Sequence, residues 1–299
     1  MSDSMASLRR KIAGAGDLQS VVRTMKAVAA SSIGQYENSV RALADYNRAV
    51  ELGLGACLRK RGAAPLMEVK YNRTPVVSAV VFGSDQGLVG QFNDVVADYA
   101  IKALSEVPGR SEVWAVGERV NGRLADAGLS LAGCYAVPSS VQAITPLVGK
   151  ILIDWELRHS LGDGAELHLF HNRPIPGAVY APVRQRLLPL DEKWSSNLAK
   201  EPWPTTNLPE VMGAGTSTLR ALIGGYLFVS LFQACAESLA SENASRLAAM
   251  QRADKNITDL LAELNGSFHR IRQRSIDEEL FDVISGFEAL NTKGGKRIR

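Results

Sequence analysis

A glycine-rich loop at residues 83–90 is the segment of this chain best suited to bind a phosphorylated ligand. It follows a short apolar run and precedes an expected helix, an arrangement in which backbone N–H groups can surround a phosphate. Its glycine spacing matches neither a dinucleotide-binding turn nor a nucleoside-triphosphate loop, and no acidic residue ends the next expected strand to bind a ribose. We therefore expect a structural turn or docking loop here, with nucleotide binding as the alternative.

The four histidines do not predict a metal centre. His168 and His171 are three residues apart on an expected strand and its exit, so they point to opposite faces and make a poor metal pair. His159 and His269 stand alone. No nucleophile elbow surrounds any serine, although residue counting leaves a Ser-His-Asp triad open. We expect no catalytic residue, no metal and no cofactor in this chain.

Composition indicates a soluble globular protein. The 299 residues are 46% hydrophobic and 22% charged, which excludes disordered and disulfide-scaffold classes. The three cysteines lie far apart without a CxxC pair, which favours a reducing compartment and excludes a thiolate zinc site. A net charge of +3 is too small to indicate nucleic acid, although residues 1–61 carry ten basic against five acidic side chains.

The sequence predicts neither export nor membrane insertion. Residues 1–10 lack the apolar core of a secretory signal. The longest apolar stretch, residues 221–236, is interrupted by Gly224, Gly225 and Gln233, so we expect no membrane-spanning helix.

Both terminal segments carry apolar residues at coiled-coil spacing. Steps of three and four run from Leu8 to about Cys57, and the end of this helix is marked by Gly53, Gly55 and Gly62 with Pro65. From Thr216 to Leu290 the same steps continue for more than seven heptads without a proline. At about 1.5 Å per residue this second helix would be on the order of 110 Å long, too long for a compact domain.

The middle of the chain alternates short apolar runs with amphipathic stretches. Such alternation predicts an α/β domain with a mostly parallel, Rossmann-like sheet. The expected strands are Val76–Phe82, Glu112–Val116, Leu129–Ala136, Ala165–Phe170 and Val183–Leu188, and the expected helices are Val95–Leu104, Val120–Ala127 and Val141–His159. The proline-rich stretch 189–209 is expected to be a linker.

The two terminal helices most simply pair as an antiparallel coiled coil, so the fold class is α/β plus long helices. The predicted parts are an N-terminal helix (1–61), a central domain (70–205), a C-terminal helix (209–290) and a basic tail (291–299). Polar residues on the second seam either fix the register or lie where the partner helix is absent: Gln233, Asn243 and Asp254.

The C-terminal helix is the longer of the two, so its far end should protrude alone. It would then expose Leu280, Val283, Phe287 and Leu290. Exposed apolar stripes of this kind usually mark an interface with a partner.

Segments from both ends and from the middle loop together resemble the gamma subunit of F-type ATP synthases. In chain order they are Ser7–Ile12, Met25–Ser31, Ser84–Asn93, Leu239–Met250, Arg272–Leu280 and Ile284–Leu290. The loop differs from the family's usual residues at Gln86, Val89, Gln91 and Phe92, which suggests a divergent, alternate-type synthase.

The resemblance implies a central rotor shaft, non-catalytic by itself. Its partners would be the ring of alpha and beta subunits, the epsilon subunit and the ring of c subunits, with no nucleic acid. Membrane association would occur only through the complex, at the cytoplasmic face of a bacterial or archaeal plasma membrane. The transported ion, proton or sodium, and the main direction, synthesis or hydrolysis, stay open.

The resemblance also implies roles for particular residues. The expected contacts with the alpha/beta ring are Met25, Lys26, Arg246, Arg272, Gln273, Phe287 and Leu290. The expected docking loop comprises Ser84, Asp85, Gly87, Gly90 and Asn93. Two alternatives remain beside the rotor: a stand-alone phosphometabolite-binding α/β enzyme carrying a helical hairpin, and a non-rotary coiled-coil scaffold that self-associates.

Overall fold

The computed structural model describes residues 4–61, 76–107, 109–159, 166–207, 209–210 and 215–294, with backbone alone at 61, 215 and 289–294. The chain falls into two compact units, residues 1–27 with 250–299, and residues 28–249. The division by role proposed from the sequence follows other boundaries, so it stays a prediction. Residues 62–69 and most of the basic tail, 295–299, lie outside the described residues.

The N-terminal segment forms two consecutive helices, α1 (Met5–Ala42) and α2 (Ala44–Arg61). The expectation of one unbroken helix was therefore wrong at Leu43. The Leu43 N–H is shared between the carbonyl oxygens of Ser39 and Val40, both at 3.2 Å, and this three-residue contact tightens the turn locally.

The C-terminal segment forms one helix, α7 (Gly215–Gly294), as its heptads predict. One stretch of it is long and apolar enough to cross a membrane by length and composition alone. Within the structure 56% of that stretch is buried, as in the core helix of a globular domain.

The terminal helices run antiparallel within each unit. In the first unit Gln19 contacts Asp254, while Arg9, earlier in α1, lies over Phe268, later in α7. In the second unit Gly225 faces Val50, and Leu222 packs against the backbone of Gly53.

Five strands form a mixed sheet in the order β3-β2-β1-β4-β5. They are β1 (Val76–Phe82), β2 (Arg110–Val116), β3 (Leu131–Tyr135), β4 (Glu166–Ile175) and β5 (Ala178–Leu188). The first four pair in parallel, and β5 returns antiparallel beside β4. The predicted α/β domain is confirmed, and β1 has the predicted bounds.

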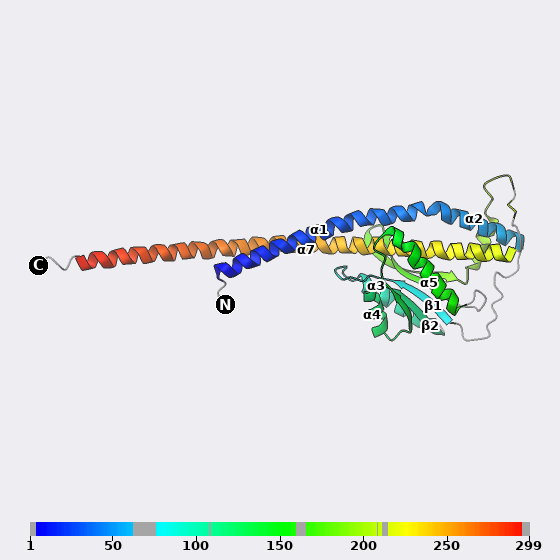
Figure 1. Ribbon diagram of the computed structural model, residues 1–299, viewed down its shortest axis with the longest axis horizontal. Helices are drawn as coiled ribbons and strands as arrows, with labels where there is room; N and C mark the ends of the chain where they lie inside the picture. Colours follow the sequence, from blue (N-terminus) through cyan, green and yellow to red (C-terminus); the bar gives the residue numbers. More distant parts are fainter. Residues whose placement is uncertain are drawn as a thin grey trace. The chain divides into compact units, whose positions relative to one another are not determined.

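Helices cover both faces of this sheet (Figure 1). Because successive residues of a strand point to opposite faces, Val77, Ala79 and Val81 pack with α3 (Phe92–Ser105) and α4 (Glu118–Asp126). Val80 and Phe82 belong to a second apolar cluster with α2, α5 (Ile144–Arg158) and α7.

A short helix, α6 (Glu192–Lys200), occupies part of the stretch expected to be a linker, so that expectation was wrong for these residues. Asp191 caps it by accepting a hydrogen bond from the Trp194 N–H at 3.0 Å. The helix packs on α2, where a Cβ atom added to Gly55 would lie 2.5 Å from the Leu198 carbonyl oxygen.

Candidate partner interface

The loop after β1 is held by an exchange of hydrogen bonds between Ser84 and Asn93, both buried. The Ser84 N–H donates to Asn93 Oδ1 at 2.9 Å, and the Asn93 amide donates to Ser84 Oγ at 2.8 Å. The Ser84 hydroxyl in turn donates to the Gln86 carbonyl at 2.8 Å. The backbone N–H at the start of the loop is therefore occupied within the protein and is not presented to a phosphate.

Asp85 joins this loop to the N-terminus of α4 and to the segment that follows β3. Its carboxylate accepts hydrogen bonds from the N–H groups of Glu118, at 3.0 Å, and Val137, at 2.8 Å. Gly117, directly before Glu118, has φ +115°, and a Cβ atom there would lie 2.8 Å from the Ser84 nitrogen. The N-terminus of α4 thus binds an internal carboxylate, which disfavours nucleotide binding at this edge of the sheet.

Two serines of α7 connect this helix to the loop by hydrogen bonds, Ser245 directly and Ser241 through Asn172. The Ser245 hydroxyl donates to the Val89 carbonyl, and the Ser241 hydroxyl donates to the Asn172 carbonyl at 3.0 Å. Asn172 of β4 then donates to the Phe92 carbonyl at 2.9 Å. These hydrogen bonds hold the predicted docking loop against α7 and β4, while Leu88 at the tip of the loop is 62% exposed.

Glu237 of α7 forms hydrogen bonds with two side chains of β4. His171 Nε2 lies 2.8 Å and Arg173 Nε 2.7 Å from Glu237 Oε2, and Gln233 donates to Oε1 at 2.8 Å. Burial alone would raise the pKa of Glu237, but these hydrogen bonds, with the nearby charge of His171, lower it to about 2. The carboxylate is therefore ionised at all ordinary pH values.

The histidines form no common site. His168 lies beside Glu166, with Nε2 3.0 Å from Oε2, while His171 has its own carboxylate in Glu237. No cluster of three metal-ligating side chains occurs among the residues described.

A serine, histidine and glutamate do meet near the beginning of β1, but without triad geometry. Ser78 Oγ and Glu112 Oε2 lie 3.2 and 3.7 Å from the same nitrogen, His159 Nε2. A triad needs the two groups on different ring nitrogens, and a reactive serine must be reachable, whereas Ser78 is fully buried.

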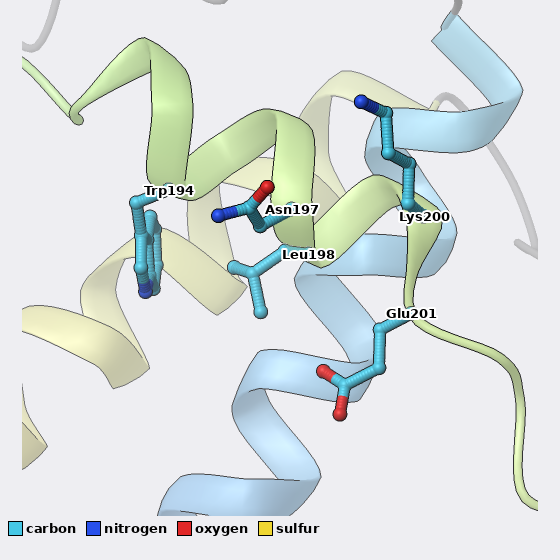
Figure 2. Close-up of a pocket in the computed structure, with 5 residues that line it drawn as sticks. All are labelled: Trp194, Asn197, Leu198, Lys200 and Glu201. Carbon is cyan, nitrogen blue, oxygen red and sulfur yellow. The ribbon is translucent and has the colours of Figure 1, made fainter.

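A hollow of about 320 Å³ beside α6 offers no catalytic set either (Figure 2). It is lined by Trp194, Asn197, Leu198, Lys200 and Glu201. The carboxylate of Glu201 already pairs with Arg48, and its carbonyl oxygen accepts from Arg59 at 3.0 Å. The lining residues thus serve to pack α6 on α2.

In the first unit, three side chains of α1 contact the carboxylate of Asp254. Its oxygens lie 3.2 Å from Gln19 Nε2, 3.3 Å from Arg23 Nε and 3.6 Å from Lys26 Nζ. Desolvation acts to raise the pKa of Asp254, yet these partners lower it overall. The partner helix is therefore present at Asp254, so the second interpretation is wrong at this residue, and register fixing by Asp254 stays a prediction.

The predicted ring contacts lie in differing surroundings. Lys26 is 41% exposed and pairs with Asp254, and Met25 beside it is half-buried. Arg272 and Gln273 are exposed. Arg246 lies in the second unit and pairs with Glu242. The side chain of Leu290 lies outside the described residues.

The last turns of α7 expose a dense set of apolar side chains. Each is at least 46% exposed: Ile276, Leu280, Phe281, Val283, Ile284 and Phe287. The predicted exposure of Leu280, Val283 and Phe287 is confirmed. A contiguous apolar surface of this kind usually marks an interface.

Comparison with known proteins gives the family. A sequence model described as ATP synthase matches residues 4–290. The chain belongs to the ATP synthase gamma family. Among its relatives, the ATP synthase gamma chains of Pelotomaculum thermopropionicum and Sulfurihydrogenibium sp. are 25% and 26% identical, and the alignments cover 96% of this chain and 99% and 98% of theirs.

The gamma-family fold also agrees with a solved structure. A chain of the Euglena gracilis mitochondrial ATP synthase, in an OSCP/F1/c-ring structure, aligns with a TM-score of 0.64 at 16% identity. The alignment covers 99% of this chain and 96% of that one.

Sequence reasoning missed Glu237, Asn172 and the serines that fasten the loop. A signal was present, because Ser241, Glu242, Asn243 and Ser245 interrupt an otherwise apolar stretch of α7. Their partners are far away in sequence and could not be named from it.

Proposed function

We propose that this gamma-family chain is the rotating central-stalk subunit of an ion-translocating ATP synthase. It would couple ion flow in the membrane sector to ATP synthesis or hydrolysis in a ring of alpha and beta subunits, with the epsilon subunit and the c-subunit ring as its other partners. The observation that carries the proposal is the family match over residues 4–290, which includes both terminal helices and the central domain.

The proposed coupling mechanism depends on the asymmetry of a single shaft inside a threefold ring. A single shaft inside a threefold ring presents different side chains to three chemically identical sites at any moment. Since a contact shifts an equilibrium only by its differential interaction with the competing states, the three sites are held at different affinities. The ATP chemistry then belongs to the ring, and this chain is non-catalytic by itself.

We assign the contacts with the alpha/beta ring to residues of α1 and α7. They comprise Met25, Lys26, Arg246, Arg272, Gln273, Phe287 and Leu290. Residues 84–93, with Ser84, Asp85, Gly87, Gly90 and Asn93, serve as the docking loop for the neighbouring subunits of the stalk. The complex would lie at the cytoplasmic face of the plasma membrane, with this chain peripheral.

Reconstitution with the alpha and beta subunits of the same source tests the proposal. We expect a complex of three alpha, three beta and one copy of this chain by native mass, with cooperative ATP hydrolysis that requires it. A folded chain that does not assemble, and instead forms a homodimer or binds nucleotide tightly, would contradict it.

A further inference from the structure

Glu242 on α7 is a buried carboxylate that is paired on one side only. Its side chain is 8% exposed, and Oε1 accepts a hydrogen bond from Arg246 Nη2 at 2.6 Å. Oε2 is buried and has no hydrogen-bond partner among the residues described. A buried acceptor left unmatched costs free energy, which offsets part of what the contact with Arg246 contributes to stability.

The titratable and charged groups that face Glu242 come from three elements. They are Tyr36 of α1, Asp85 of the docking loop, and Cys235 and Arg246 of α7 itself. Burial raises the pKa of Glu242, Arg246 partly offsets this effect, and Asp85 adds to it. The carboxylate therefore takes up a proton at a pH above the ordinary range for glutamate.

Glu242 contacts the guanidinium of Arg246 at one of its nitrogens, Nη2. Glu242 and Arg246 are four residues apart and so share a face of the helix. A guanidinium has five N–H donors in one plane, and Glu242 engages Nη2, which leaves further donors on the fork for a second carboxylate. At 14% exposure the Arg246 side chain still reaches the surface.

We propose that Glu242 is a positioning residue, which fixes the guanidinium of Arg246 for a carboxylate of the assembled ring and releases it on protonation. This inference rests on the proposed function, because it takes Arg246 as a ring contact. Neutral Glu242 keeps its shape but loses the charge that orients Arg246, so proton uptake would weaken one contact between shaft and ring.

The test is a double-mutant cycle in the complex reconstituted with alpha and beta subunits. ATP hydrolysis is measured across pH for the wild type, Glu242→Gln, Arg246→Gln and the double variant. The control is Glu237→Gln, which removes another ion-paired glutamate of α7 that does not contact Arg246. Native mass confirms assembly of each complex.

We expect Glu242→Gln to lower the hydrolysis rate about threefold to tenfold at neutral pH, and to have no further effect when Arg246 is already replaced. The ratio of wild-type to Glu242→Gln rates should fall toward one as the pH is lowered. Glu237→Gln should show no such change in ratio.

Independent, multiplicative effects of Glu242→Gln and Arg246→Gln, or a rate ratio that does not change with pH, would overturn the inference. If Glu242→Gln does not assemble, Glu242→Ala replaces it, and a wild-type rate of Glu242→Ala at every pH would likewise overturn the inference. Failure of both to assemble while Glu237→Gln assembles would make Glu242 structural. If the wild-type chain itself does not assemble, the proposed function fails instead.

Discussion

One side-chain amide, that of Asn93, holds the start of the predicted docking loop. Asn93 satisfies both the N–H and the hydroxyl of Ser84 in a buried position. We expect Asn93→Ala to destabilise the second unit by about 1–3 kcal/mol, because it leaves the Ser84 N–H buried and unmatched. Urea unfolding measures the loss. Gln86→Ala, which removes an exposed side chain of the same loop, serves as control, and equal effects of the two variants would contradict the assignment.

Glu237 should give the second unit a particular dependence on pH. Its pKa is lowered in the folded state, so its contribution is complete above the unfolded value of 4.5 and is lost as the pH falls toward about 2. The shift corresponds to about 3 kcal/mol. Glu237→Gln should therefore cost most at neutral pH and progressively less below 4.5.

Urea unfolding of the wild type and Glu237→Gln over this pH range checks the sign. The exposed Glu156→Gln on α5 is the matched control. A cost that grows as the pH falls would mean that the His171 and Arg173 contacts do not govern this carboxylate.

Asp254 matters for how the two helices of the first unit pair. We expect Asp254→Lys to repel Arg23 and Lys26 and to speed amide hydrogen exchange in α1 over residues 17–27. The neighbouring exposed residue gives the control, since Asp259→Lys makes the same charge change away from these partners. Unchanged exchange in Asp254→Lys would show that the apolar seam alone sets the register.

The exposed end of α7 should matter for assembly and not for the stability of the isolated chain. We expect Phe287→Ser to change the free energy of unfolding by less than about 0.5 kcal/mol, since the side chain is 65% exposed. Binding to the alpha/beta ring should weaken, as measured by the concentration of chain needed for half-maximal hydrolysis. Undiminished assembly would remove Phe287 from the interface.

At the element scale the sequence was informative wherever periodicity was long or a strand was fully buried. The heptads of α7 and the apolar run of β1 predicted these elements, because each repeats one simple pattern. α6 was missed because Pro189 and Pro202 flank it, although Asp191 is a recognisable N-cap. The turn at Leu43 depends on hydrogen-bond sharing, which leaves no trace in the apolar pattern.

For the candidate interface, residue types were predictable but pairings were not. The exposed stripe at 280–287 follows from the lengths of the two helices. The strand partners of Glu237 and the loop partner of Ser245 are more than sixty residues away in sequence, and tertiary packing alone brings them together.

At the scale of the whole molecule, removal of residues 271–299 tests whether the far end of α7 transmits rotation. We expect the truncated chain to retain the second unit, which lies entirely within 28–249, and to lose or weaken coupling between ion flow and ATP synthesis. The measurement is ion-driven ATP synthesis in vesicles, with circular dichroism to confirm folding. Unaltered ion-coupled synthesis would count against the shaft role.

The six exposed apolar side chains at the end of α7 also affect the fate of the chain before assembly. In a copy made in excess of its partners, none of the residues described here covers these side chains, and a second copy could cover them only by associating. Such a chain is an aggregation hazard until a ring encloses it. Matched synthesis with the ring subunits, or rapid proteolysis of unassembled copies, is therefore a requirement that this helix places on the cell.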